Sequence, residues 1–296
     1  MSTKLRELLE SKSIVKVGGA FDAMSAKLVE MSGFDAIWAG SFAISATHAL
    51  PDASIMTMTE FLNATKNMAD SCSIPVLADC DTGFGGPPNV SHMVKKYESA
   101  GIAAVSIEDK LFPKQNSLLE NSKQELLPEK DFVAKLIAAK DAKTNQDFMI
   151  IARVEALIAG LEMKEAIKRA NAYFNAGADA ILIHSKQKSP DEIFEFCDAW
   201  KNDIPLIVVP TTYPNVTIKE LISHKIKMVI YANQTLRVAY YAISKLLKQL
   251  KNSSSLSEIK VDMSSMEDIF HLQETYTIQK QEQSIEENLK KLGYIN

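Results

Sequence analysis

Acidic residues stand in two segments of the sequence, each directly after a short apolar run. Asp79 and Asp81 follow the run 75–78, and Glu108 follows the run 103–107. Carboxylates brought together repel one another unless a cation or protons compensate them. Mg²⁺ prefers carboxylate and water oxygens and often takes only one or two ligands directly from the protein. If the fold joins the two segments, these three side chains predict a Mg²⁺ site.

Two basic or titratable residues follow later apolar runs. Arg153 follows the run 148–152, and His184 follows the run 180–183. A guanidinium group binds carboxylate or phosphoryl oxygens in a bidentate way, so Arg153 and His184 can hold an anionic substrate that also touches a metal. Simpler interpretations stay open, because a lone aspartate after a strand is often a helix N-cap and Arg153 can pair with Glu155 at the surface.

The elements that must position these residues alternate along the chain. Eight short apolar runs are separated by helical stretches, and several are apolar on both faces, as parallel strands covered by helices are. The runs are 14–17, 36–39, 75–78, 103–107, 148–152, 180–183, 205–209 and 228–231. Eight βα units in 296 residues predict an α/β protein with a (β/α)8 barrel. No GxGxxG follows the first run, which disfavours a dinucleotide-binding fold.

A barrel collects the carboxyl ends of all its strands at one face, so the residues above are expected to meet there. One connection at that face is unusually long. Residues 110–128 separate the fourth strand from the next helix, and loops of this length in compact domains are often lids or binding loops. The alternative is an ordinary surface insertion.

Composition excludes several classes of protein. With 46% apolar and 24% charged residues the chain can bury a core, so it is not intrinsically disordered. The net charge of −4, without a basic stripe, argues against a nucleic-acid partner. No apolar run approaches the roughly 18 residues that span a membrane, and the N-terminus has no secretory core. Three dispersed cysteines (Cys72, Cys80 and Cys197) indicate neither structural zinc nor disulfides, so we expect a cytoplasmic protein.

The composition changes near the C-terminus. We expect residues 1–250 to form the catalytic barrel and residues 251–296 to form a helical extension. The segment 252–255 is polar, and two amphipathic helices are predicted around 266–275 and 278–292. A barrel does not need them. They are expected to dock on the barrel or on a neighbouring subunit, and the sequence does not separate these two cases.

Two motifs resemble those of a known enzyme family. Residues 79–85, DCDTGFG, resemble the DxDTGxG signature of the phosphoenolpyruvate mutase/isocitrate lyase superfamily. Residues 108–117, EDKLFPKQNS, are similar to the EDK-x5-NS motif of phosphoenolpyruvate mutases. The segments starting at Arg153 and His184 look like the next two elements of the family's active-site rim, and the resemblance extends over about 17–233.

The resemblance implies a Mg²⁺-dependent isomerase that interconverts phosphoenolpyruvate and phosphonopyruvate, the first step of phosphonate biosynthesis. By this analogy Asp79 binds Mg²⁺ directly, while Asp81, Glu108 and Asp52 act mainly through bound water. Asp52 matches an aspartate once proposed as a nucleophile in the family. The resemblance favours a dissociative path through metaphosphate, for which the protein chiefly positions the group and neutralises charge.

The resemblance also implies where the substrate lies. Arg153, His184 and Asn116 are expected to contact its phosphoryl group, and Lys114 and Ser117 belong to a gating loop. That loop excludes water, which would otherwise convert the reactive intermediate into phosphate.

The substrate carboxylate is expected on backbone amides near Ser41 and Phe42, in the segment that begins at Trp38 and Gly40. Some mutases carry Ser-Gly-Leu after the tryptophan, whereas this chain has Ala-Gly-Ser-Phe. Backbone amides do not depend on side-chain identity, so the anion site is still expected.

Three alternatives accompany this interpretation. Phosphonopyruvate hydrolases share the first motif but typically lack the Asn-Ser pair, so Asn116 and Ser117 favour the isomerase. A lyase of the methylisocitrate type needs a loop cysteine, and no cysteine lies between Cys80 and Cys197. A non-catalytic barrel should have lost part of the charged rim, and every group is present. The resemblance and the extra helices further suggest a homotetramer of helix-swapped dimers.

Overall fold

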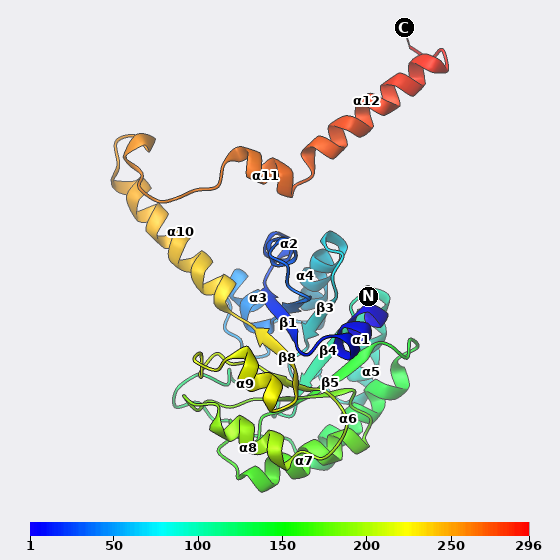
Figure 1. Ribbon diagram of the computed structural model, residues 1–296, viewed down its shortest axis with the longest axis vertical. Helices are drawn as coiled ribbons and strands as arrows, with labels where there is room; N and C mark the ends of the chain where they lie inside the picture. Colours follow the sequence, from blue (N-terminus) through cyan, green and yellow to red (C-terminus); the bar gives the residue numbers. More distant parts are fainter. Residues whose placement is uncertain (296) are drawn as a thin grey trace. The chain divides into compact units, whose positions relative to one another are not determined.

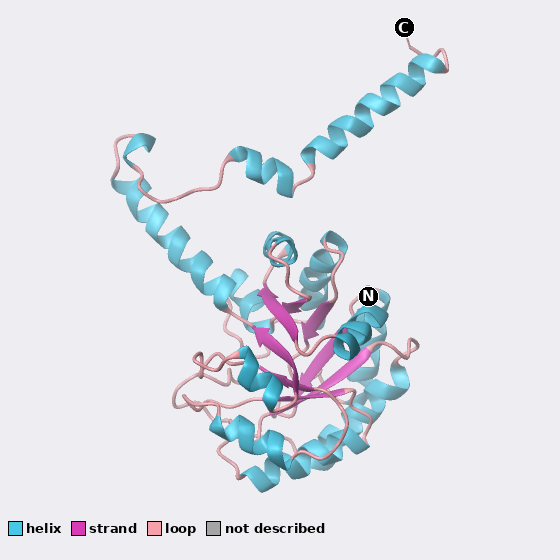
Figure 2. Cartoon of the chain, in the orientation of Figure 1, coloured by secondary structure: helices cyan, strands magenta, loops and turns pink. Residues whose placement is uncertain are grey.

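Eight parallel strands close into one barrel in the order β1-β2-β3-β4-β5-β6-β7-β8 (Figures 1 and 2). The computed structural model describes residues 1–295. The strands are β1 (Val15–Ala20), β2 (Ala36–Ala39), β3 (Val76–Asp79), β4 (Ala104–Glu108), β5 (Met149–Val154), β6 (Ala180–Ile183), β7 (Leu206–Val208) and β8 (Ile226–Tyr231). The predicted (β/α)8 barrel is confirmed, and every predicted strand overlaps an observed one.

The first strand differs most from its prediction. It was expected at 14–17, but it continues to Ala20 through two glycines. Gly18 and Gly19 pair with Ile37 and Trp38 of β2 in a parallel register. Glycine weakens an isolated strand and often marks a close approach of another backbone. Here the neighbouring strands on both sides hold the glycines in the sheet, which a local pattern does not reveal.

Helices surround the barrel and bury its outer face (Figure 2). They are α1 (Ser2–Ser11), α2 (Ala23–Met31), α3 (Ser41–Thr47), α4 (Met58–Ser71), α5 (Pro87–Ser99), α6 (Glu129–Ala142), α7 (Met163–Asn175), α8 (Asp191–Ala199) and α9 (Ile218–Ser223). Inside the barrel, Val17, Leu77 and Met228 belong to an apolar cluster that also includes Leu5 and Leu9 of α1. The barrel interior is therefore a packed core, and a ligand can bind only at the open end of the barrel.

A second compact unit follows the barrel. The first unit spans Met1–Arg237 and the second spans Val238–Asn296. The second unit contains most of α10 (Gln234–Asn252), a 3-10 turn (Leu256–Glu258), α11 (Met266–Leu272) and α12 (Thr275–Lys291). The boundary expected after residue 250 lies inside α10, and the two predicted terminal helices overlap α11 and α12. None of the helices within residues 1–295 is both long and apolar enough to cross a membrane.

Gly19 lies where β1 meets β8 to close the barrel. A Cβ atom at this position would lie 2.2 Å from the carbonyl oxygen of Ala232 and 2.8 Å from that of Tyr231. Both contacts are with backbone, which cannot rotate away as a side chain can. The absence of a side chain at Gly19 is therefore a requirement of barrel closure.

We expect Gly19→Ala to lower the free energy of unfolding by about 1–3 kcal/mol, because overpacking forces backbone shifts. Chemical denaturation followed by circular dichroism measures this. Gly86→Ala is the matched control, since a Cβ there would meet nothing closer than 3.9 Å. Equal stability of the two variants would contradict the steric argument.

Candidate active site

The residues expected to form the site come together at the carboxyl ends of the strands. Asp79 and Glu108 are the last residues of β3 and β4, and Arg153 lies near the end of β5. His184 follows β6 directly. Trp38 belongs to β2, and Asp81 lies two residues after the end of β3. The connections after β2 and β4 supply the remaining residues, which are Gly40, Ser41, Phe42, Asp52, Lys114, Asn116 and Ser117.

A cavity of about 700 Å³ opens between these residues. Eleven of the expected residues line it: Trp38, Gly40, Ser41, Phe42, Asp52, Asp79, Lys114, Asn116, Ser117, Arg153 and His184. Asp81 and Glu108 do not line the cavity, although both are almost fully buried and contact residues that do. Arg237 also lines it and was missed from the sequence, because it lies after the last strand, outside the motifs.

The acidic residues surround a single ammonium group. Lys114 Nζ lies 2.6 Å from Asp81 Oδ1, 3.0 Å from Asp52 Oδ1 and 3.8 Å from Glu108 Oε1. It also donates a hydrogen bond of 3.1 Å to Ser41 Oγ, which in turn donates to Asp79 Oδ2 at 3.0 Å. Burial opposes the charged ammonium, but the surrounding carboxylates raise the pKa of Lys114 well above its ordinary value. A cation thus stands among the carboxylates.

The donor chemistry of this cluster fits Mg²⁺. With Lys114 among the carboxylates, no three His, Cys, Asp or Glu side chains of residues 1–295 are arranged to hold a metal ion. Yet the carboxyl oxygens of Asp81 and Glu108 are buried and, apart from their ion pairs with Lys114 and Arg153, have no hydrogen-bond partner. Burial and the nearby carboxylates raise the pKa of Asp81 to about 6 against the attraction of Lys114. Buried carboxylate oxygens whose main partner is one ammonium group are suited to a hard cation in its place.

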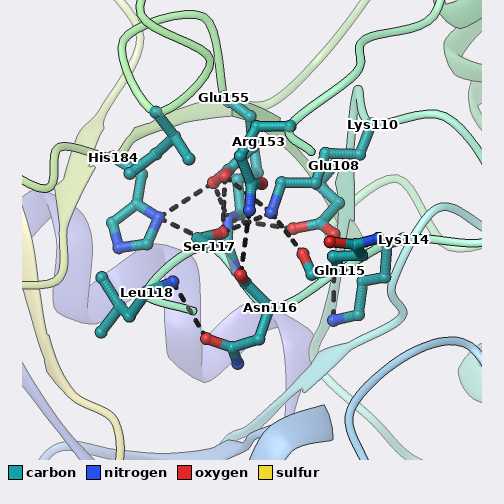
Figure 3. A network of polar contacts seen from close by, with 12 residues as sticks. Glu108, Lys110, Lys114, Gln115, Asn116, Ser117, Leu118, Arg153, Glu155 and His184 are labelled. Atoms are coloured by element: carbon teal, nitrogen blue, oxygen red, sulfur yellow. Dashed lines mark hydrogen bonds and ion pairs between the residues drawn. The ribbon is translucent and has the colours of Figure 1, made fainter. Parts of the chain in front are cut away.

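A second cluster centres on Glu155, which the sequence analysis did not select (Figure 3). Its Oε1 lies 2.5 Å from Arg153 Nε and 2.9 Å from His184 Nδ1. Its Oε2 accepts a hydrogen bond of 2.6 Å from Ser117 Oγ and lies 3.3 Å from Lys110 Nζ. Burial opposes ionisation, but Arg153, His184 and Lys110 hold the pKa of Glu155 well below its ordinary value. The pair of Arg153 with Glu155, which the sequence left open as a surface contact, is therefore buried.

Arg153 connects the two clusters. Besides Glu155, its guanidinium lies 3.4 Å from Glu108 Oε2 and 3.9 Å from Asp79 Oδ2. Nη2 of Arg153 also lies 3.0 Å from Nδ1 of His184. Burial lowers the pKa of His184, and the charge of Arg153 acts in the same direction while Glu155 opposes it. The imidazole is thus held beside a permanent cation, facing the cavity.

Asp109 shows why Glu155 is held in place. It follows Glu108 and points to the opposite side, as successive residues in extended backbone do. Its Oδ1 accepts the backbone N–H of Glu155 at 2.9 Å, and its Oδ2 accepts hydrogen bonds from Tyr173 at 2.6 Å and Arg169 at 3.1 Å. The alternation of side chains after Glu108 could have indicated this structural role for Asp109.

The long loop after β4 closes over one side of the cavity. Asn116 Nδ2 donates to Asp52 Oδ2 at 2.8 Å, and the backbone N–H of Lys114 donates to Ser54 Oγ at 3.2 Å. Burial opposes ionisation of Asp52, yet Lys114 and Asn116 hold its pKa below the ordinary value. The segment after β2 and the loop after β4 are therefore joined across the cavity by charged and polar contacts.

We expect Glu155→Gln to destabilise the protein by about 3 kcal/mol, because it leaves buried cations without their shared carboxylate. Thermal and chemical unfolding measure the change. Asp70→Asn makes the same chemical substitution in the exposed Lys66–Asp70 pair and should alter stability by less than about 0.5 kcal/mol. If both variants are as stable as the parent protein, the central role of Glu155 is wrong.

Comparisons with known proteins identify the family of this chain. The family model described as phosphoenolpyruvate phosphomutase matches residues 5–251. Phosphonopyruvate hydrolase of Variovorax sp. is 43% identical over 91% of this chain and 93% of its own length. Phosphoenolpyruvate phosphomutase of Tetrahymena pyriformis is 42% identical over 92% of this chain and 91% of its own.

Solved structures of a phosphomutase and a hydrolase are similar to this chain over most of its length. The phosphoenolpyruvate phosphomutase of Streptomyces platensis subsp. rosaceus superposes with a TM-score of 0.93 at 44% identity, covering 96% of this chain and 98% of that one. A phosphonopyruvate hydrolase, crystallised with oxalate and Mg²⁺, has a TM-score of 0.88 at 40% identity and covers 94% and 96%. The resemblance found in the motifs is thereby confirmed, and the chain belongs to the phosphoenolpyruvate phosphomutase family.

Proposed function

We propose that this protein is a Mg²⁺-dependent phosphoenolpyruvate mutase that interconverts phosphoenolpyruvate and 3-phosphonopyruvate, and so makes the carbon–phosphorus bond that begins phosphonate biosynthesis. The observation that carries the proposal is the position of Asn116. Its amide lies in the cavity wall and donates to Asp52 at 2.8 Å, on the loop that also brings Lys114 and Ser117 to the site. A mutase needs such a group to hold a transferring phosphoryl.

Opposite sides of the cavity supply the two anion sites of this substrate. Arg153 and His184, at the ends of β5 and β6, would bind the phosphoryl group together with Asn116. Backbone N–H groups around Ser41 and Phe42, after β2, would bind the carboxylate. Barrel order supports this division, because β2 and β6 face one another across a closed eight-stranded barrel. The substrate would span the mouth between them.

The metal site would be formed by Asp79, with Asp81, Glu108 and Asp52 acting through water. The related hydrolase binds Mg²⁺ with oxalate, and we expect the same of this chain. When bound, Mg²⁺ supplies positive charge against the negative charge that builds up as the phosphoryl group departs. Lys114 would leave the centre of the carboxylates and turn toward the substrate.

The chain's own residues would control the transfer. In the direction of phosphonate formation, the oxygen–phosphorus bond of phosphoenolpyruvate breaks, and its electron pair remains on the enolate. The phosphoryl group stays on Arg153, His184 and Asn116 and then accepts the electron pair of the methylene carbon, which forms the carbon–phosphorus bond. No proton is consumed, so the residues chiefly position the group and neutralise charge.

Water must be kept from the transferring group. Lys114 and Ser117 are 4% and 7% exposed, although both lie in a loop. Ser117 accepts from Lys110 at 2.6 Å and from Arg153 at 3.0 Å while donating to Glu155. These contacts anchor the loop at the cavity, which supports its role as a lid that disfavours hydrolysis.

Phosphonopyruvate hydrolase is the second candidate, because a relative that is 43% identical over 91% of the chain has this activity. The same cavity would serve, and the outcome depends on whether water enters. Phosphorus NMR of phosphonopyruvate with the purified protein and Mg²⁺ separates the two. Appearance of the phosphoenolpyruvate ester signal is expected; release of orthophosphate with pyruvate would replace the mutase by the hydrolase.

We also propose that the protein is a cytoplasmic homotetramer. The second unit exposes large apolar side chains on α10 and α12, among them Val238, Tyr241, Leu247, Ile278 and Ile285. All three cysteines are free thiols, which suits a reducing compartment. Light scattering of the purified protein measures the assembly, and a monomeric mass would exclude the tetramer.

Asp79→Asn should abolish Mg²⁺ binding and activity, because a neutral amide replaces the one carboxylate proposed to bind the metal directly. Isothermal calorimetry with MgCl₂ measures the binding independently of turnover. Asp70→Asn, on the exposed face of α4, is the control and should bind Mg²⁺ like the parent. Unchanged Mg²⁺ affinity in Asp79→Asn would show that the assigned metal ligand is wrong.

Asn116→Ala should lower kcat by about 100-fold, in the range of a lost transition-state donor, while the fold stays intact. Asn121→Gly, in the same loop but outside the cavity wall, is the control and should remain active. Steady-state kinetics with phosphonopyruvate measures both variants. A near-normal rate for Asn116→Ala would contradict its proposed contact with the phosphoryl group.

A further inference from the structure

Arg237 is a cation of the cavity wall that the proposed mechanism does not use. It lies in the first turn of α10, where its backbone N–H donates to the carbonyl of Asn233 at 3.1 Å. The start of the helix is tied to the barrel, because Thr235 Oγ donates to the carbonyl of Gly19 at 2.8 Å. Arg237 thus stands on a fixed element, and its side chain lines the cavity.

The other two permanent cations of the cavity wall are already compensated. Lys114 pairs with Asp52 and Asp81, and Arg153 pairs with Glu155. Within residues 1–295, Arg237 is in no ion pair and its side chain makes no hydrogen bond. A guanidinium that faces a cavity without an acidic partner is available to an anionic ligand.

The end of β8, which precedes Arg237, lies close to one of the two proposed anion sites. Strand β8 pairs with β1, and β1 pairs with β2. Where a Cβ of Gly40 would lie, the carbonyl oxygen of Ala232 is only 3.9 Å away. The end of β8 therefore adjoins the segment that begins at Gly40. Of the two residues proposed for the phosphoryl group, Arg153 lies near the end of β5, three strands from β8, and His184 follows β6, which is two strands from β8, as β2 is. The short distance between Gly40 and Ala232 is therefore the observation that favours the carboxylate side.

We propose that Arg237 is a substrate-binding residue that contacts the carboxylate of the 2-oxo acid or enol ester, beside the backbone amides of Ser41 and Phe42. This inference rests on the proposed function for the identity of the substrate. The charges favour it, because the carboxylates Asp52, Asp79, Asp81, Glu108 and Glu155 are only balanced by Lys110, Lys114, Arg153 and the proposed Mg²⁺. The substrate adds further negative charge, which the uncompensated guanidinium of Arg237 can neutralise on the side of the carboxylate.

Calorimetric titration of oxalate in the presence of Mg²⁺ tests the contact without turnover. We expect Arg237→Gln to weaken oxalate binding roughly fivefold, as the loss of a charge-assisted hydrogen bond at an exposed position does. Arg237→Lys should recover part of the affinity. Lys245→Gln removes one positive charge from the same helix, outside the cavity wall, and should bind oxalate like the parent.

The kinetic readout separates a carboxylate contact from a phosphoryl contact. Arg237→Gln should raise KM for phosphonopyruvate by a similar factor with little change in kcat, and methylphosphonate, which lacks a carboxylate, should inhibit it as it inhibits the parent. Parental oxalate affinity in Arg237→Gln would overturn the proposal, and so would an equal loss in Lys245→Gln. Absence of oxalate binding by the parent would also overturn it. If the parent hydrolyses phosphonopyruvate instead, the proposed function fails while the oxalate titration still decides the role of Arg237.

Discussion

The site depends on the close approach of carboxylates that repel one another. Asp52, Asp79, Asp81 and Glu108 come from three different parts of the barrel mouth, and burial removes the water that would screen them. Such a cluster persists only when a cation or bound protons compensate it. In this structure Lys114 supplies positive charge, while burial and the neighbouring carboxylates still raise the pKa of Asp81 to about 6. The arrangement is suited to a divalent ion.

The need to compensate buried charge also explains the cluster around Glu155. Arg153 faces Glu108 and Asp79 on one side and Glu155 on the other, so its guanidinium is fixed between two acidic groups. Asp109, held by Arg169 and Tyr173 of α7, binds the backbone of Glu155. Buried hydrogen bonds from α7 through Asp109 thus fix Glu155, and Glu155 in turn fixes the guanidinium of Arg153. Residues outside the cavity wall therefore help to determine where the residues that line it lie.

In our proposal, the loop after β4 decides between isomerase and hydrolase. One mutase and one hydrolase of the family are about equally similar to this chain, at 42% and 43% identity, and the proposed metal site would serve either reaction. Asn116 and Ser117 would then keep the phosphoryl group and exclude water. The contacts of Ser117 with Lys110, Arg153 and Glu155 make the loop part of the charged network. The position of the loop therefore depends on the same buried charges that hold Arg153.

The sequence by itself determined the fold class and identified eleven of the residues that line the cavity. Apolar runs that are buried on both faces have few interpretations other than parallel strands, and polar residues after such runs identify the open end of a barrel. It did not determine that β1 continues through Gly18 and Gly19, because neighbouring strands stabilise glycines that are unfavourable in isolation. The tertiary structure alone decided the contacts of Glu155 and Asp109 and the place of Arg237 on the cavity wall. Glu155 is held by residues more than thirty positions away in the sequence, such as Asp109 and Ser117, and local patterns carry no information about such contacts.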